Sequence, residues 1–306
     1  MAFSASESAF EGFRIIRREP ATVAIWVVIL LVLGGAAMAV MLPLLNGFTA
    51  SVTPGATPSG TQLAALGSLM RVYLFALPIY LVLLSVFTAA IYRAVLRPQE
   101  KGFARLRLGG DELRLIGLFL LMGLFFFAVF LVLGFVAGLV VGGLFAATGA
   151  KGAGGFALAM MVIYLALIAV CVWFGVKFSF AAPLTFSQKR IRFFASWGAT
   201  KGKFWPLLGC YLLAWVFVIL VLLVDLVVSG ALMLGAAGGD FSRVSSAMLR
   251  PDVTSAMGLL SPIYIVRLVV GAIFGVVMWM VGIAPAASAY REIVAPKPED
   301  QAETFA

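Results

Sequence analysis

The chain has 306 residues, of which 63% are hydrophobic and 11% are charged, and its formal net charge at pH 7 is +9. Because a soluble domain carries roughly 25% charged residues, this composition excludes a water-soluble globule and indicates a protein solvated by lipid. The sequence contains no histidine, which removes the commonest general base and the commonest metal ligand.

Long apolar runs divide the chain. A run of about 18 residues or more is long enough to cross a bilayer core of about 30 Å. The sequence therefore predicts an all-α polytopic membrane protein with six transmembrane helices arranged as three hairpins. In chain order, the predicted spans are residues 21–45, 69–96, 115–148, 156–182, 204–235 and 261–294. Residues 1–294 are predicted to form one transmembrane domain, and the acidic residues 295–306 a disordered tail.

Lysine and arginine gather in alternate gaps between these runs. Arg14, Arg17 and Arg18 precede the first span, and the gaps after the second and fourth spans are rich in cations, whereas residues 46–68 carry no charge. Cytoplasmic loops carry the excess of Lys and Arg in membrane proteins. We therefore expect a multi-pass protein of the bacterial inner (cytoplasmic) membrane with both termini in the cytoplasm.

Three basic segments precede the outgoing spans. Phe13, Phe103 and Phe193 are spaced 90 residues apart, each among cations and apolar residues. This spacing predicts pseudo-repeats at about 1–96, 97–186 and 187–294, although any membrane hairpin can carry Phe and Arg at its cytoplasmic edge.

These basic segments are predicted to be amphipathic helices in the headgroup plane, with membrane lipids as their partners. The clearest of them is residues 187–202, for which an ordinary solvated loop is the alternative. Because the cations flank spans, attraction to anionic lipid explains the net charge, and nucleic acid is not an expected partner. A protein partner is left unknown.

Glycines recur at four-residue spacing in two spans. Gly134, Gly138 and Gly142 lie in the third span, and Gly271 and Gly275 lie in the sixth. Small residues at this spacing let helix backbones approach closely, so we expect tight helix packing there.

Three ionisable residues inside spans are the candidate binding residues. Lys177 lies near the inner end of the fourth span, where its long side chain can reach the interface. Asp225 and Arg267 lie towards the outer ends of the fifth and sixth spans, which run in opposite directions. Their similar depth predicts a structural ion pair, with a substrate or proton site as the alternative.

Motifs for catalysis are absent from the sequence. It contains no HExxH, P-loop or GxSxG pattern, and no pairing of cysteine with histidine. The adjacent Asp111 and Glu112 are expected in the first turn of a helix, where acids interact well with the macrodipole. We therefore expect no catalytic residue, no metal and no cofactor.

Residues 196–205 read Ser-Trp-Gly-Ala-Thr-Lys-Gly-Lys-Phe-Trp and open a span. This string resembles a recurring element of the glycerophosphoryl diester phosphodiesterase membrane-domain family, a group of six-span bacterial proteins. Some members carry a soluble phosphodiesterase domain after the membrane domain, but this sequence has neither that domain nor its metal-binding cluster. What the resemblance implies is a polytopic membrane module.

Two functions follow as expectations. The first is a non-enzymatic inner-membrane module that organises lipid or a protein partner, since basic interfacial segments are present and catalytic groups are missing. The alternative is a small-solute or lipid transporter with Asp225 and Arg267 near its path. A polar cavity that reaches these two residues would favour transport.

Overall fold

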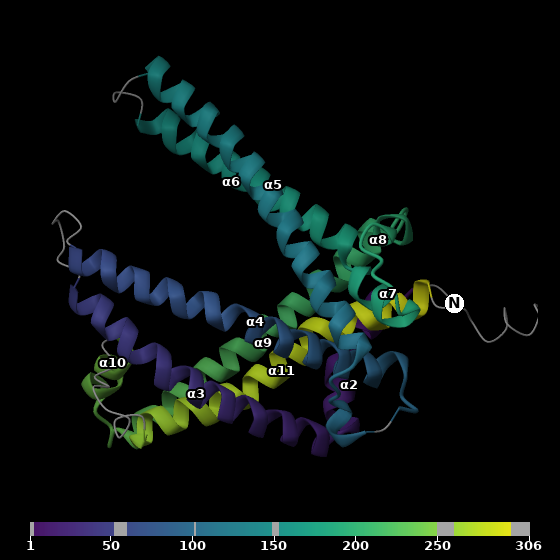
Figure 1. Ribbon diagram of the computed structural model, residues 1–306, viewed down its shortest axis with the longest axis horizontal. Coiled ribbons are helices and arrows are strands. Elements are labelled where there is room, and N and C mark those ends of the chain that lie inside the picture. The colour runs from purple at the N-terminus through teal and green to yellow at the C-terminus, as the bar shows by residue number, and fades with distance from the viewer. Residues whose placement is uncertain (1–2, 52–59, 101, 149–152, 250–259, 295–306) are drawn as a thin grey trace, which may run out of the picture. The chain divides into compact units, whose positions relative to one another are not determined.

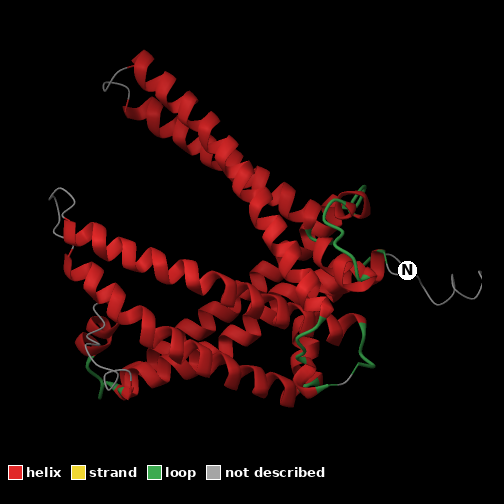
Figure 2. Ribbon diagram, viewed as in Figure 1, coloured by secondary structure: helices red, strands yellow, loops and turns green. Residues whose placement is uncertain are grey.

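The computed structural model describes residues 3–51, 60–100, 102–148, 153–249 and 260–294, and every regular element in these ranges is a helix (Figure 2). The long helices are α3 (Pro20–Ser51), α4 (Gly60–Leu96), α5 (Gly110–Thr148), α6 (Ala153–Phe178), α9 (Phe204–Ala236) and α11 (Pro262–Ile293) (Figure 1). The short helices are α1 (Ala5–Ala9), α2 (Glu11–Arg18), the 3-10 turn η1 (Phe103–Arg105), α7 (Ala181–Gln188), α8 (Ala195–Ala199) and α10 (Phe241–Leu249).

Six helical segments are long and apolar enough to cross a membrane, and they coincide with the six predicted spans. The all-α polytopic membrane fold is thereby confirmed. The fourth segment continues to Gln188, further than predicted, because α7 follows α6 after a break of only two residues. At about 1.5 Å per residue, all six of these helices exceed a 30 Å hydrocarbon core, so they tilt or extend into the headgroup region.

The chain divides into two compact units. The larger unit consists of Ser6–Arg107 and Cys210–Ser288, and it holds α2, α3, α4, α10 and most of α9 and α11. The smaller unit consists of Leu108–Gly209 with the segments Met1–Ala5 and Ala289–Ala306. The predicted threefold repeat stays a prediction.

Aromatic rings join three long helices of the larger unit. Trp26 of α3 packs edge-on against Phe87 of α4 with ring centroids 5.3 Å apart, and Phe87 packs against Trp279 of α11 at 5.1 Å. Trp26 is 1% exposed and Phe87 is 2% exposed. A buried aromatic pair contributes about 0.5–1.5 kcal/mol beyond the area it buries, so this row of rings fixes how α3, α4 and α11 pack.

The short helix α2 lies directly against the backbone of α11. A Cβ atom built on Gly12 would stand 2.6 Å from the Cα of Val281 and 2.7 Å from the carbonyl oxygen of Met280. No side chain fits at such distances, and the atoms in the way are backbone atoms that cannot turn aside. Glycine at position 12 is therefore required for this contact.

The smaller unit is built on the hairpin of α5 and α6, with α7 and α8 packed beside it. The helix α5 begins at Gly110 and carries both Asp111 and Glu112 in its first turn, as predicted. The Glu112 carboxylate accepts a hydrogen bond from the Gly109 backbone N–H at 3.0 Å. This contact satisfies a donor that a helix start leaves free, which explains why an acid stands at this position.

Outer faces of the long helices are apolar, and examples are Phe75, Phe135 and Val227, each at least 68% exposed. In a membrane-spanning protein such faces contact lipid. Among the described residues, no atom lies within 4 Å of a Cβ built on any of the five glycines at four-residue spacing in α5 and α11. The predicted close packing at those glycines is therefore wrong. Close packing involves Gly34 and Gly35 of α3 instead, against the Leu268 side chain at 3.3–3.4 Å.

Candidate functional site

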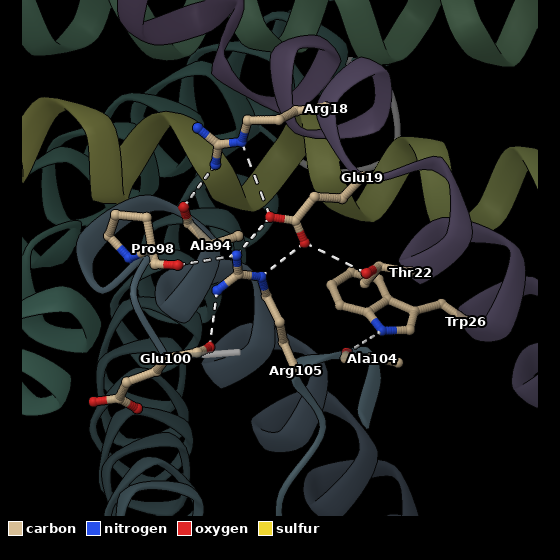
Figure 3. A network of polar contacts seen from close by, with 9 residues as sticks. All are labelled: Arg18, Glu19, Thr22, Trp26, Ala94, Pro98, Glu100, Ala104 and Arg105. Carbon is tan, nitrogen blue, oxygen red and sulfur yellow. Dashed lines mark hydrogen bonds and ion pairs between the residues drawn. The ribbon is translucent and has the colours of Figure 1, made fainter. Parts of the chain in front are cut away.

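A buried ion pair lies in the larger unit, where the loop after α4 passes the start of α3 (Figure 3). The Arg105 guanidinium donates from Nε to Glu19 Oε2 at 2.7 Å and from Nη2 to Glu19 Oε1 at 2.6 Å. The Arg105 side chain is 7% exposed and that of Glu19 is 16% exposed. Two parallel charge-assisted hydrogen bonds of this kind define both the position and the orientation of the arginine.

Backbone carbonyls take up further Arg105 donors. Nη1 donates to the Glu100 carbonyl at 3.1 Å, and Nη2 donates to the Pro98 carbonyl at 3.4 Å. The hydrogen bond from Arg105 is the main cause that lowers the pKa of Glu19 below its ordinary value, and the charges of Arg105 and Arg18 lower it further against the opposing effect of burial. Glu19 is consequently ionised throughout the physiological range, and Arg105 is committed to holding the loop.

The loop backbone at this point is strained. Ala104 and Arg105 have φ angles of 47° and 55°, in the left-handed region that side chains other than glycine rarely adopt. Each such residue costs about 1–2 kcal/mol. Trp26 offsets this cost by donating its indole N–H to the Ala104 carbonyl at 2.9 Å, and Arg93 donates to the Arg105 carbonyl at 2.8 Å. Strain persists only where the surroundings hold it, as they do here.

An open cleft of about 540 Å³ adjoins this network. Its lining residues are Arg18, Glu19, Pro20, Ala21, Thr22, Pro98, Gly102 and Arg105. Arg18 donates from Nη2 to the Ala94 carbonyl at 2.8 Å, and its Nε lies 3.9 Å from Glu19 Oε1. Within the described part of the chain, Arg18 Nη1 makes no hydrogen bond or ion pair. The Arg18 side chain is 52% exposed, so it combines a fixed position with unused donors.

The second cation-rich loop, in the smaller unit, differs from its prediction. A helix was expected over residues 187–202, but α7 ends at Gln188, Lys189 adopts a φ of 55°, and only Ala195–Ala199 is helical in the following stretch. The prediction of one interfacial helix is therefore wrong. Phe193, which an interfacial helix would place against lipid, is instead 3% exposed and stacks on Phe178 with ring centroids 4.3 Å apart. Burying this ring is more favourable than forming the predicted amphipathic helix, and it turns the chain inward between the flanking cations.

Hydroxyl groups attach this loop to the end of α6. Ser196 donates to the Lys177 carbonyl at 2.8 Å and accepts the Phe180 backbone N–H at 3.1 Å. The Thr200 hydroxyl donates to the Ser196 carbonyl at 3.0 Å, and it also lies 3.3 Å from the Lys177 carbonyl. Both side chains are completely buried. The Ser and Thr of the string at 196–205 therefore close the end of a transmembrane helix by satisfying its last polar groups.

Residues 189–205, here called the basic–aromatic loop, present cations and apolar side chains together. Its five exposed cations are Lys189, Arg190, Arg192, Lys201 and Lys203. Its exposed apolar side chains are Ile191, Phe194, Trp197 and Trp205, at 50%, 67%, 39% and 77% exposure. Lys177 lies in the last turn of α6, with its ammonium 5.7 Å from the centre of the Trp197 ring. The candidate Lys177 thus belongs to the edge of this loop.

Asp225 and Arg267 do not form the predicted ion pair. Asp225 accepts a hydrogen bond from Ser229, one turn along the same helix, at 3.0 Å. Arg267 is exposed, and no described residue forms an ion pair or hydrogen bond with its side chain. The depths differ as well, because Ile263 and Val266, close to Arg267 in α11, pack against the cluster of Met233, Ala237 and Val244. The α9 members of this cluster, Met233 and Ala237, lie at least eight residues beyond Asp225, or about 12 Å along the helix.

The Glu19–Arg105 pair was missed by sequence reasoning. The one feature of the sequence that could have indicated this pair is an acidic residue directly before a span, between Arg18 and Pro20. Within the described residues, no group of three or more His, Cys, Asp and Glu side chains could hold a metal ion. Comparisons with protein-family models, with curated proteins and with solved structures give no match. The resemblance of residues 196–205 rests on those residues alone.

Proposed function

We propose that this protein is a non-enzymatic module of the bacterial inner membrane that organises anionic lipid on the cytoplasmic side. The observation that carries the proposal is the basic–aromatic loop, in which five exposed cations alternate with exposed Ile, Phe and Trp side chains. Cations near an anionic membrane surface contribute about 1 kcal/mol each, and aromatic side chains favour the headgroup level. Ser196 and Thr200 hold this surface on the end of a transmembrane helix, so it is at the depth of the headgroups.

The proposal places both termini and both cation-rich loops in the cytoplasm. Reporter fusions after Glu100 and Ser196 should then report the cytoplasm, and fusions after Ser59 and Ser246 the outer side. Ser59 lies outside the described residues. One inverted result at an internal site would contradict the six-span orientation and with it the cytoplasmic side of the lipid surface.

Lipid enrichment around the full-length protein tests the function itself. The protein is reconstituted in nanodiscs with equal amounts of phosphatidylglycerol and phosphatidylcholine, and the lipids within contact range are measured with fluorescent or brominated lipid. We expect enrichment of phosphatidylglycerol that decreases strongly in a variant with Arg190→Gln, Arg192→Gln and Lys201→Gln, and that decreases at high salt.

A matched control changes exposed cations elsewhere. Arg243 lies beyond α9, on the side expected to be outside the cell, and pairs with Asp240 at 3.3 Å. Arg71 is exposed near the start of α4, also on that side. Arg71→Gln with Arg243→Gln should leave the enrichment unchanged. If wild-type protein shows no preference for phosphatidylglycerol, the proposed function is wrong.

The transporter alternative remains a prediction. It needs a polar path that reaches Asp225 or Arg267, and the cleft beside Arg105 is lined by neither. Each of the two residues also has a local explanation. Ser229 satisfies Asp225, and Arg267 stands five residues from the start of α11, about 7.5 Å, where its side chain reaches the interface.

A further inference from the structure

We infer that the cleft lined by Arg18, Thr22 and Gly102 binds the phosphate of one anionic phospholipid. This site lies in the larger unit and is separate from the basic–aromatic loop. It deepens the proposed function by naming a single lipid position, and it rests on that function.

The position of the cleft suits a headgroup. Its lining includes Pro20, the first residue of α3, and Pro98, two residues beyond the end of α4. Both helices span the membrane, so the cleft opens at the boundary between hydrocarbon and water. Its volume of about 540 Å³ lies within the range of small-molecule sites, roughly 300–1,000 Å³.

The charge of the lining matches a phosphodiester. The charged groups are the Arg18 and Arg105 guanidinium ions and the Glu19 carboxylate, a formal excess of one positive charge. A phospholipid with a phosphodiester as its one charged group carries one negative charge. Because Arg105 is engaged by Glu19 and by carbonyls, the cation with donors to spare is Arg18.

Arg18 is held in place before any ligand arrives. Its Nη2 is fixed on the Ala94 carbonyl, which leaves Nη1 to donate to a phosphate oxygen (Figure 3). The Thr22 hydroxyl, which donates to Glu19 Oε2 at 3.4 Å, is a second polar group of the lining. A guanidinium N–H that donates to a phosphate oxygen makes a charge-assisted hydrogen bond, about twice as strong as a neutral one.

The strained turn supplies both rigidity and an apolar border. Trp26 and Arg93 hold Ala104 and Arg105 in the left-handed conformation, next to Gly102 of the cleft. Phe103, within this turn, is 76% exposed. A lipid whose headgroup occupies the cleft would therefore have an exposed ring, one residue along the chain from Gly102, available to its acyl chains. A soluble phosphate compound has no use for such a ring. This feature favours lipid over a free phosphodiester.

Native mass spectrometry of the full-length protein tests the site. The detergent-solubilised protein is titrated with phosphatidylglycerol, and the affinity of the first bound lipid is measured for wild type and three variants. We expect Arg18→Gln to weaken that affinity by about tenfold, because a charge-assisted contact is lost. Arg18→Lys, which keeps the charge and loses the fork, should weaken it by only about threefold.

Arg17→Gln is the matched control, because Arg17 is the neighbouring exposed cation and does not line the cleft. It should change the affinity less than twofold, because an exposed charge outside the cleft makes no direct contact with the phosphate and is partly screened by salt. Equal losses in Arg17→Gln and Arg18→Gln, or no loss in either, would overturn the site. Both variants alter the hydrogen bond to the Ala94 carbonyl, but only Arg18→Gln removes the positive charge. Equal losses of affinity in Arg18→Gln and Arg18→Lys would therefore overturn the role of charge.

A competition arm separates the two possible sources of the phosphate. Glycerophosphoglycerol carries the same headgroup without acyl chains, and we expect it to displace phosphatidylglycerol poorly. If it competes as well as the lipid does, the lipid assignment is overturned in favour of a soluble phosphodiester. The loop variant with Arg190, Arg192 and Lys201 replaced should lose bulk enrichment and keep the first bound lipid, so failure of the proposed function and failure of this site give different results.

Discussion

The loop after α4 and the basic–aromatic loop are both rich in cations, but they use them in opposite ways. In the loop after α4, Arg105 is 7% exposed and most of its donors are bound to Glu19 and to backbone carbonyls. In the basic–aromatic loop, hydroxyl groups and stacked rings make the attachment, and none of the five cations forms an ion pair with another described residue. The positive-inside pattern does not distinguish between these two uses.

The difference shows which cations are available to lipid. A cation such as Arg105 that is buried in the fold already donates its hydrogen bonds to protein acceptors. Binding a phosphate would therefore add little binding energy. A loop fixed by Ser196 and Phe193 leaves its charges exposed, where the proposed lipid partners can reach them. The comparison therefore predicts large stability effects in the first loop and large lipid effects in the second.

Breaking the buried ion pair should have the largest effect on stability. Glu19→Gln leaves the Arg105 guanidinium buried without its counter-ion, and we expect a loss of about 3 kcal/mol, seen as a lower Tm in detergent. The surface control is Glu100→Gln, whose carboxylate is 37% exposed and pairs with Arg97 and Arg107. This change should cost less than about 1 kcal/mol. Similar losses in the two variants would contradict the contrast between buried and surface pairs.

Acid should weaken the same pair without any mutation. The pKa of Glu19 lies below its ordinary value of 4.5, so the pair's full contribution to stability is present above about pH 4.5 and is lost as the pH falls through the lowered pKa. We expect the difference in Tm between wild type and Glu19→Gln to shrink as the pH is lowered into this range. A difference that stays constant down to the lowest accessible pH would show that Glu19 protonation is not linked to folding.

Removing the hydroxyl that fixes the basic–aromatic loop should have an intermediate effect. Ser196→Ala removes the donor to the Lys177 carbonyl and the acceptor of the Phe180 N–H, which is then buried without that partner. We expect the free energy of unfolding to fall by about 1–3 kcal/mol, which is seen as a lower Tm in detergent. Thr200→Ser keeps its hydroxyl and serves as the control, with a smaller loss. If lipid enrichment falls together with Tm in Ser196→Ala, the anchored geometry matters as well as the charge.

The outer charges should give the smallest effect. Because Asp225 and Arg267 are not paired, Asp225→Ala and Arg267→Ala should lower stability independently, and their effects should add in the double variant within about 0.5 kcal/mol. Thermal melts of the two single variants and the double variant measure this directly. Partial recovery of stability in the double variant would show that the two side chains are coupled, in agreement with the ion pair that the sequence predicted.

Hydropathy was sufficient to predict the membrane fold. Six apolar runs gave all six spans, since bilayer thickness sets a length that few other structures require. The helix start at Asp111 and Glu112 was also predictable, because capping depends on neighbouring residues. Periodicity failed at residues 187–202, where a single buried ring, Phe193, overrode the amphipathic pattern.

The sites were less accessible to sequence reasoning. The Glu19–Arg105 pair joins residues 86 positions apart, and nothing in the local sequence marks Ala104 and Arg105 as left-handed. Asp225 and Arg267 were paired by counting depth in two spans, but Ile263 and Val266 pack against the cluster of Met233, Ala237 and Val244, which sets a different register. Long-range partners and helix register both depend on packing that a single sequence does not display.

The contact of Gly12 with the backbone of α11 has a consequence for biogenesis. Helix α2 is translated near the beginning of the chain, and its docking surface at Met280 and Val281 belongs to the last of the described spans. During synthesis, α2 therefore cannot make this contact until α11 has also been made and inserted. The packing of α2 against α11 is therefore a late step in the assembly of the larger unit.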